Sequence, residues 1–202
     1  MKLSMPVMAS PITGTKTNMG GGMTEEEYAN AVILGCKQSG TLAFIGDGAT
    51  PDKYMIGINS AFSLGCKAIP VFKPRADKNE IFKRIEAASQ AGLPAIGIDI
   101  DAASLLTMSL KGQKVEPKSI SKISEIVKES PVPVILKGIM SVEDAKKAVD
   151  SGVNAIVVSN HGGRVLDCMP GTMDVLPEIA DAVKGKVSII ADGGVRTGND
   201  IV

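Results

Sequence analysis

The sequence predicts an α/β fold, and within that class an incomplete (β/α)8 barrel of the TIM type. Three observations support it: short apolar runs alternate with segments of helical periodicity, polar groups follow almost every run, and no interior stretch has the composition of a domain boundary. A doubly wound sheet shares this alternation but gathers its polar groups at one switch point, so the barrel is favoured. Because about seven βα units are present and an eighth strand is missing, we expect residues 1–202 to form one domain that is truncated at its C-terminal end.

The expected strands are short runs of mostly aliphatic or β-branched residues, the composition of parallel strands that are buried on both faces. In chain order they are residues 6–9, 41–45, 68–72, 95–99, 133–136, 156–158 and 187–191. Each of the later runs ends in a glycine or an ionisable residue within a few positions, which places polar chemistry at the carboxyl ends of the strands.

Capping residues mark where the expected helices begin. Thr24 with Glu27 forms a capping box, Ser141 is followed by Asp144 at the same spacing, and Asp77 precedes another apolar stripe. Helical patterns begin near residues 24, 51, 77, 120, 141 and 176, and glycines end four of them at positions 40, 92, 152 and 185. The mixed composition of residues 101–118 predicts a long connection.

Composition limits the classes of partner. The chain has 22 Lys and Arg against 22 Asp and Glu, so its formal net charge is zero, which argues against nucleic acid and against an anionic membrane surface as the main partner. Only 3% of the residues are aromatic, so we expect an aliphatic core. Three cysteines without C-x-x-C spacing indicate a reducing compartment, and no signal peptide or transmembrane stretch is visible, so a cytoplasmic location is expected.

The most informative stretch begins with the apolar run Ile156–Val158 and continues with Ser159, Asn160 and His161, the only histidine in the chain. Two glycines separate this histidine from Arg164, whose planar guanidinium suits a carboxylate or a phosphate. Such an imidazole can take a proton from an anionic substrate that the arginine holds. The alternative is a histidine that caps a turn and an arginine in a surface ion pair, but the strand-end position and the glycines favour a functional site.

Other polar groups are expected at the same edge of the sheet. Asp99 would orient His161, and Lys137 would place a cation at the mouth or pair with an acid. Gly193 and Gly194 before Arg196 describe either a phosphate cradle or an ordinary turn. Neither a nucleophile elbow nor a cluster with metal-ligand spacing is found in the sequence, so no metal is predicted.

At these residues the chain resembles the FMN-dependent α-hydroxy-acid oxidase and dehydrogenase family, which includes glycolate oxidase, lactate oxidase and flavocytochrome-type lactate dehydrogenase. The order and spacing agree over about residues 130–202, and the match is looser earlier, at residues 9–11 and Asp99. The motifs that carry the resemblance are Leu136-Lys137-Gly138, Ser159-Asn160-His161-Gly162-Gly163-Arg164 with Leu166-Asp167, and Asp192-Gly193-Gly194-Val195-Arg196.

The resemblance implies a barrel with FMN at the carboxyl ends of its strands and a small 2-hydroxy acid, such as lactate or glycolate, oxidised to the 2-oxo acid. His161 would be the base with Asp99 as its partner, Arg164 and His161 would bind the anionic substrate, and Lys137 would stabilise negative charge near the flavin N1/O2 edge. The remaining implied FMN contacts are Pro11, Ile12, Thr13, Ser159, Asp192, Gly193, Gly194, Val195 and Arg196. The resemblance also implies a homo-oligomer.

Several family features are replaced in this sequence. Residues 70–73 read Pro-Val-Phe-Lys where the family has Gln-x-Tyr, and Ala102-Ala103 stand where a second substrate arginine is expected. These differences leave two alternatives open. One is a flavin- or phosphate-binding barrel that acts on a different substrate or is not catalytic, and the other is an inert fragment whose open sheet edge aggregates.

Overall fold

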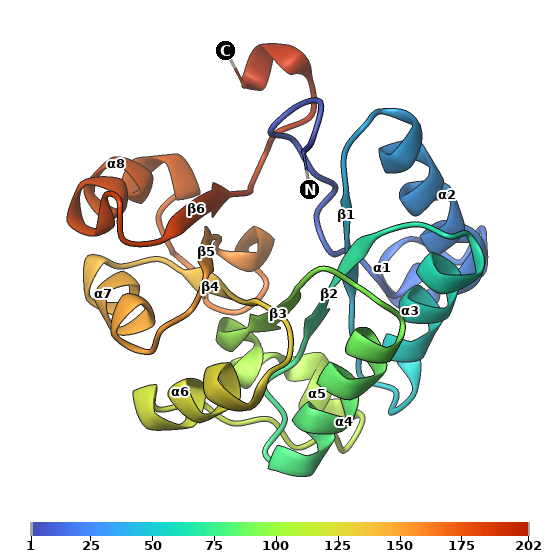
Figure 1. Cartoon of the computed structure of the whole chain (residues 1–202), viewed down its shortest axis with the longest axis horizontal. Coiled ribbons are helices and arrows are strands. Elements are labelled where there is room, and N and C mark those ends of the chain that lie inside the picture. The colour runs from blue at the N-terminus through green and yellow to red at the C-terminus, as the bar shows by residue number, and fades with distance from the viewer. Residues whose placement is uncertain (1, 202) are drawn as a thin grey trace.

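The computed structural model describes residues 2–201, and its centre is one parallel sheet that curves into an arc. The strands pair strictly in chain order, and Figure 1 shows the helices arranged around the outside of the arc. This order without a switch point is that of a barrel, and the arc stays open between its first and last strands, so the predicted incomplete barrel is confirmed. The strands are β1 Ala43–Gly46, β2 Ala68–Phe72, β3 Ile96–Asp99, β4 Val134–Ile139, β5 Ala155–Val158 and β6 Ser188–Ala191.

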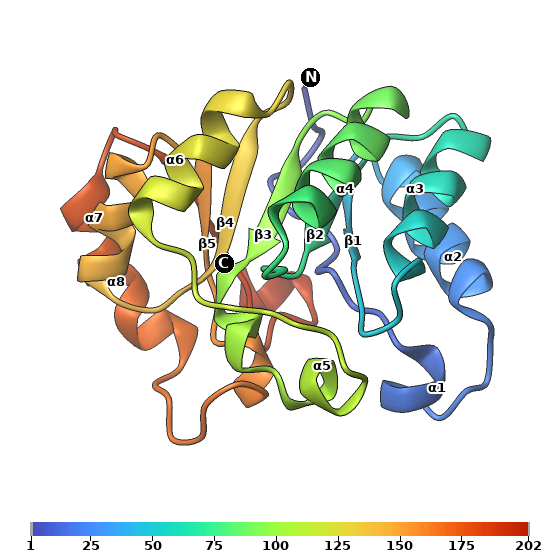
Figure 2. The ribbon, with the colours of Figure 1, turned by 90° about the horizontal axis from the view of Figure 1, so that it is seen from below.

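Helices connect successive strands, and Figure 2 shows the same ring of helices from the side. The α-helices are α1 Thr15–Asn18, α2 Glu25–Gln38, α3 Lys53–Ser63, α4 Lys78–Gln90, α5 Leu106–Leu110, α6 Ile120–Glu129, α7 Val142–Asp150 and α8 Thr172–Val183. Three 3-10 turns are η1 Ile100–Ser104, η2 His161–Gly163 and η3 Gly198–Asp200. Among residues 2–201, no helix combines the length and the apolar composition needed to cross a membrane.

Alternation along the strands divides the core into two parts. Side chains such as Ile98, Leu136 and Ile156 pack against the helices, whereas Ile135 and Val157 belong to a smaller cluster on the concave side of the sheet. Since successive side chains of a strand point to opposite faces, every second residue continues the concave series toward the carboxyl ends. The residues that continue this series are Lys73 after β2, Asp99 in β3, Lys137 in β4 and Ser159 after β5.

Two predictions of secondary structure were wrong. Residues 6–9 do not form a regular strand, because only Ala9 pairs with β1, through one bridge to Ala43. Pro6 and Pro11 flank this contact and lack an N–H group, so the pairing does not extend. Residues 2–201 therefore contain six strands and not seven, and the connection predicted over residues 101–118 contains most of η1 and all of α5.

The predicted helix caps are present and give a test of the fold. Ser141 Oγ accepts a hydrogen bond from the Asp144 backbone N–H at 3.1 Å and donates one to Asp144 Oδ2 at 2.9 Å. We expect Ser141→Ala to lower the free energy of unfolding by about 1 kcal/mol in urea titrations, because it leaves an N–H at the start of α7 without its partner. Ser141→Thr keeps the hydroxyl and serves as the control, and equal midpoints for the two variants would contradict this role of the cap.

Candidate active site

The carboxyl ends of four neighbouring strands bring a group of ionisable side chains together on the concave face. Asp99 is the last residue of β3 and lies directly opposite Lys137 of β4 in the strand register. Lys73 follows β2, and His161 opens the turn η2 after β5. The apolar strands leading to these positions hold their backbones rigidly, so the side chains meet at fixed distances.

Asp99 is held between two lysines. Lys73 Nζ donates to Asp99 Oδ2 at 2.6 Å, and Lys137 Nζ donates to Oδ1 at 3.3 Å. All three side chains are less than one-tenth exposed. Burial alone would raise the pKa of Asp99, but the two ammonium groups, together with His161, outweigh burial and hold this pKa well below its usual range.

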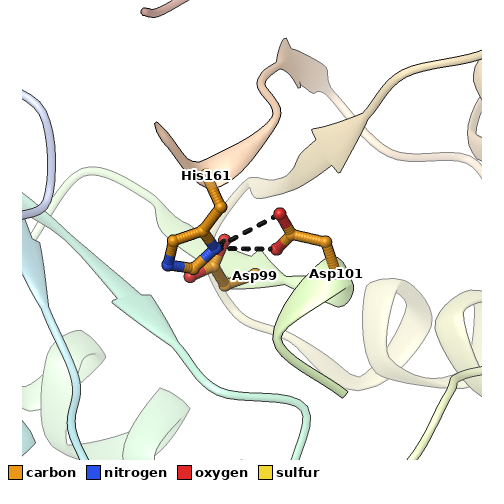
Figure 3. Close-up of side chains that lie close together, drawn as sticks. All are labelled: Asp99, Asp101 and His161. Atoms are coloured by element: carbon orange, nitrogen blue, oxygen red, sulfur yellow. Dashed lines mark hydrogen bonds and ion pairs between the residues drawn. The ribbon is translucent and has the colours of Figure 1, made fainter. Parts of the chain in front are cut away.

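His161 lies against two carboxylates (Figure 3). Its Nδ1 is 3.1 Å and 3.2 Å from the two carboxylate oxygens of Asp101, and 3.5 Å from Asp99 Oδ1. The imidazole is only 12% exposed, so these contacts are shielded from solvent. With carboxylates on its Nδ1 side, the ring donates its Nδ1 proton to them, which leaves the lone pair on Nε2.

The backbone of the histidine turn has an unusual conformation. His161 has a φ of 57°, which is in the left-handed region, and Gly162 and Gly163 follow with φ values of 65° and 71°. The turn is tied down by two hydrogen bonds: the His161 N–H donates to Ser159 Oγ at 3.2 Å, and the Gly162 N–H donates to Asn160 Oδ1 at 3.0 Å. A strained non-glycine residue that its surroundings hold in place is a frequent mark of a functional position.

Charge extends from this cluster toward the end of the last strand. Lys137 Nζ is 3.8 Å from Asp192 Oδ2, so the lysine bridges Asp99 at the end of β3 and Asp192 after β6. Burial would lower the pKa of Lys137, but Asp99, Asp192 and Asp101 outweigh burial and raise it. Burial and the negative charge of Asp99 raise the pKa of Asp101, against the opposing hydrogen bond to His161. The lysine therefore keeps its positive charge at the mouth at neutral pH.

The acid–histidine group has some geometry in common with metal sites. One ligand atom from each of Asp99, Asp101 and His161 lies within 4.8 Å of the others, which is a spacing that metal sites share. However, the ammonium groups of Lys73 and Lys137 already occupy Asp99, and a divalent cation next to them would be repelled. Hydrogen bonds and ion pairs therefore account for this acid–histidine cluster.

Arg164, the predicted anchor of the substrate, lies outside this cluster. Its side chain is exposed, and its Nη2 donates to Oδ1 of Asn18, the last residue of α1, at 3.3 Å. Gly162 and Gly163 between them have left-handed backbones, and among the described residues Arg164 makes no hydrogen bond or ion pair with Asp99, Asp101 or His161. Sequence spacing alone did not reveal this, and the substrate-binding role of Arg164 stays a prediction.

The loop that includes Pro11, Ile12 and Thr13 is clamped by Glu25. This carboxylate accepts hydrogen bonds from the backbone N–H groups of Gly14 (2.6 Å) and Thr15 (3.1 Å) and from Thr13 Oγ1 (3.2 Å). The loop also packs closely on the end of β1, where a Cβ atom at Gly46 would lie 2.9 Å from Thr13 Cγ2 and 3.1 Å from the Pro11 carbonyl oxygen. The predicted cofactor loop therefore has a fixed backbone at the edge of the site.

The residues predicted to hold a phosphate follow β6. Gly193 and Gly194 have φ values of 113° and 75° and are exposed, as are Val195 and Arg196. Beside Gly193 lies the buried hydroxyl of Thr172, which has no hydrogen-bond partner among residues 2–201. After the two glycines, the described part of the chain forms only the short turn η3.

Two residues of the cluster were missed as site residues. In the sequence, Lys73 stands out only as a departure from a motif, and Asp101 belongs to a stretch with the composition of a connection. Alternation along β2 would have found Lys73, because it follows the concave-facing Val71 by two positions. Asp101 lies in η1, beyond the end of β3, so strand alternation does not predict its direction. Their contact partners come from other strands, so only the fold shows what they touch.

Comparison with known proteins connects this geometry to a family. Residues 106–202 match the family model described as FMN-dependent dehydrogenase. Mouse 2-hydroxyacid oxidase 1 is 31% identical over 212 residues, which cover 85% of this chain and 56% of that protein. The chain belongs to the FMN-dependent α-hydroxy-acid oxidase and dehydrogenase family. This assignment confirms the resemblance carried by the motifs around Lys137, His161 and Asp192.

Other members of the family agree in sequence and in fold. L-lactate oxidase from Lactobacillus jensenii is 46% identical over 107 residues, which cover 52% of this chain and 26% of that protein. A solved structure described as a lactate oxidase from Pediococcus acidilactici matches 98% of this chain and 59% of its own chain, with a TM-score of 0.76 and 28% identity. The chain thus spans about a quarter to three-fifths of the length of these relatives.

Proposed function

We propose that this chain binds FMN at the carboxyl ends of its strands and takes part in the oxidation of a small 2-hydroxy acid, such as lactate or glycolate, to the 2-oxo acid. The observation that carries the proposal is the buried cluster in which His161 lies against a carboxylate and Lys137 lies 3.3 Å from Asp99. Membership in the FMN-dependent family and relatives named L-lactate oxidase and 2-hydroxyacid oxidase support it.

His161 acts as the base in this proposal. Its Nδ1 side is occupied by Asp101 and Asp99, and its Nε2 has no hydrogen-bond partner among the described residues. The Nε2 lone pair can therefore accept the proton of a substrate hydroxyl, and the carboxylates stabilise the imidazolium that results. Arg164 is the proposed partner of the substrate carboxylate, and it would have to release Asn18 to serve in that role.

The residues at the rim fit FMN in their chemistry. The clamped backbone of residues 11–13 and the Ser159 hydroxyl would line the ring system and the ribityl chain, and Asp192 would bind ribityl hydroxyls. Lys137 carries a positive charge suited to the negatively polarised edge of the flavin, and the left-handed Gly193 and Gly194 leave N–H groups for a phosphate. Bound FMN supplies the acceptor for the two electrons that leave the substrate.

The experiment that tests the function is spectroscopic. FMN is titrated into the purified chain, and the complex is then mixed without oxygen with a panel of 2-hydroxy acids, including lactate and glycolate. Saturable binding followed by bleaching of the flavin spectrum is the expected result. An inert fragment would bind no FMN in a saturable way. A homo-oligomeric state and a cytoplasmic location stay predictions.

A second candidate is a flavin-binding barrel that does not oxidise 2-hydroxy acids. The specific observation in its favour is Lys73, which replaces part of the family's Gln-x-Tyr pattern and donates a hydrogen bond to one oxygen of Asp99. The same panel separates the two candidates, since this one predicts bound FMN that no 2-hydroxy acid bleaches.

The phosphate end of the site gives a further prediction. If Gly193, Gly194 and Arg196 bind the phosphate, FMN should bind more tightly than riboflavin, which lacks it. Arg196→Ala should then weaken FMN binding by about tenfold, a loss of one charge-assisted contact, and leave riboflavin binding unchanged. Fluorescence quenching of the two flavins measures this difference. An equal loss for both flavins would place the phosphate elsewhere.

A further inference from the structure

We propose that Lys73 and Asp99 form a compensating ion pair, in which Lys73 cancels the charge of Asp99 so that Lys137 keeps its positive charge for an anionic ligand at the mouth. The inference rests on the proposed function only for the identity of that ligand, bound FMN. The two lysines lie at unequal distances from Asp99, because Lys73 Nζ is 2.6 Å from Oδ2 and Lys137 Nζ is 3.3 Å from Oδ1. The hydrogen bond and the Coulomb attraction both weaken with distance, so Lys73 is the principal partner of Asp99.

Without Lys73, the charge on Lys137 would be outweighed. Asp99 stands directly opposite Lys137 in the register of β3 and β4, and Asp192 Oδ2 lies 3.8 Å from the same ammonium. Two carboxylates would then surround one lysine, and the local negative charge would oppose a bound anion. Lys73 supplies the second ammonium, so the two lysines balance Asp99 and Asp192.

The electrostatics of Asp99 agree with this assignment. Burial raises the pKa of Asp99, and the charge of Lys73 is the largest of the influences that lower it, ahead of Lys137 and His161. These charges outweigh burial and hold the pKa well below its usual range. The carboxylate is therefore ionised at neutral pH, and Lys73 stabilises it more than any other single group does.

The backbone holds the two lysines in place. The Lys73 N–H donates to Asp47 Oδ2 at 3.1 Å, and Arg75 Nη2 donates to the same oxygen at 3.2 Å. Asp47 is 1% exposed and Lys73 is 7% exposed, so water competes little for these contacts. On the other side, β4 bulges next to Lys137, because Gly138 has a φ of 99° and the register with β5 shifts there. Both ammonium groups therefore start from fixed backbones.

The pair also accounts for a departure in the sequence. The family pattern Gln-x-Tyr has no charged side chain, whereas residues 70–73 of this chain end in Lys73. A buried ammonium is unfavourable unless an acid pairs with it, and Asp99 on the neighbouring strand is that acid. The lysine therefore changes the motif, and its charge is cancelled within the site.

The single histidine reports the charge on Asp99, because His161 Nδ1 lies 3.5 Å from Asp99 Oδ1. The C–H resonances of His161 are followed by NMR across pH in the chain without flavin. In Lys73→Met the midpoint of the imidazole titration should rise by about one unit, because the charge of Asp99 is no longer cancelled and stabilises the imidazolium. Lys73→Arg keeps the charge, and Lys146→Met removes an exposed lysine of α7, so both controls should titrate like the parent.

Stability shows whether the two residues act as a pair. Urea midpoints are measured for Lys73→Met, Asp99→Asn and the double variant. Each single change leaves a buried charge without its partner and should lower the midpoint, whereas the double variant should lose less than the sum of the two losses. If Lys73→Met fails to fold alone, recovery of the fold in the double variant gives the same support. Additive losses would show that the two residues act independently and would overturn the pair.

Bound FMN tests the part of the inference that concerns Lys137. In Lys73→Met the reduction potential should fall by about 30 mV, a tenfold smaller equilibrium constant for a two-electron reduction, because uncancelled Asp99 disfavours added negative charge. In the double variant with Asp99→Asn the potential should return to the parent value. A potential that stays low in the double variant would show that Lys73 contacts the ligand directly, and it would overturn the action of Lys73 through Asp99.

The outcomes separate this inference from the proposed function. The histidine titration and the urea midpoints need no flavin, so they test the pair even in a chain that binds no FMN. An unchanged His161 midpoint in folded Lys73→Met overturns the pair, whatever a 2-hydroxy acid does to the flavin spectrum. A raised midpoint in a chain whose bound FMN no 2-hydroxy acid bleaches supports the pair and rejects the proposed oxidation.

Discussion

Replacement of His161 by glutamine is expected to slow reduction of bound FMN by a 2-hydroxy acid by about 10²–10⁴-fold, the usual contribution of a positioned base. The amide of glutamine cannot accept a proton at neutral pH. FMN binding should persist, because the predicted cofactor contacts come from the loop at residues 11–13, from Lys137 and from the segment after β6. Anaerobic stopped-flow spectroscopy measures the rate, and FMN titration measures the binding.

The matched control for this variant is Met173→Gln, which introduces the same side chain at an exposed position of α8. It should reduce flavin at the parent rate. If His161→Gln is reduced as fast as the parent, the assignment of the base is wrong. If His161→Gln fails to bind FMN, the histidine turn contributes to the cofactor site directly.

The second large effect is expected on stability. Asp99→Ala removes the acceptor that Lys73 and Lys137 share, and it leaves two buried ammonium groups close to each other without it. Breaking a buried ion pair from one side typically costs about 3–5 kcal/mol. We therefore expect a loss of that size in the free energy of unfolding at neutral pH, measured by urea denaturation with circular dichroism.

The pH dependence of this loss follows from the pKa of Asp99. Because that pKa is held below its usual range, the carboxylate stabilises the fold at pH values above the pKa of the unfolded chain, about 4. The stabilisation disappears as pH falls through the lower pKa of the folded chain. The difference between the parent and Asp99→Ala should therefore shrink on acidification below about pH 4.

A surface pair provides the control for the Asp99 prediction. Glu143→Gln removes one partner of the exposed contact with Lys147 on α7, and its urea midpoint should equal that of the parent. If Asp99→Ala loses as little free energy of unfolding at neutral pH as the control, the two lysines find other partners or solvent in the variant.

The local residue pattern was sufficient to predict secondary structure where the chain carries its own capping and turn residues. The strand predicted at residues 68–72 has the observed bounds of β2, and the caps at Thr24 and Ser141 are formed as expected. It was insufficient at residues 6–9, where composition resembles a strand but the flanking prolines limit pairing to Ala9. Whether a run pairs depends on its neighbours in space, which the pattern does not contain.

The candidate site was predicted only in part, because several of its contacts depend on residues that are neighbours in space and not in sequence. Lys137, Asp99 and His161 were expected at one edge, and the structure brings them together. The contact of Asp101 with His161 depends on a turn after β3 and on the bulge at Gly138, which are features of different strands. The direction of Arg164 depends on two left-handed glycines, whose conformation the sequence allowed but did not require.

The left-handed backbone at His161 restricts which amino acids evolution or a saturation library can place there. Asparagine, aspartate and glycine accept a φ of 57°, whereas β-branched side chains such as valine and isoleucine clash with their own backbone in that region. Histidine is among the few chemically active side chains that tolerate this geometry. The turn therefore admits an imidazole and excludes β-branched side chains by shape, before any reaction has taken place.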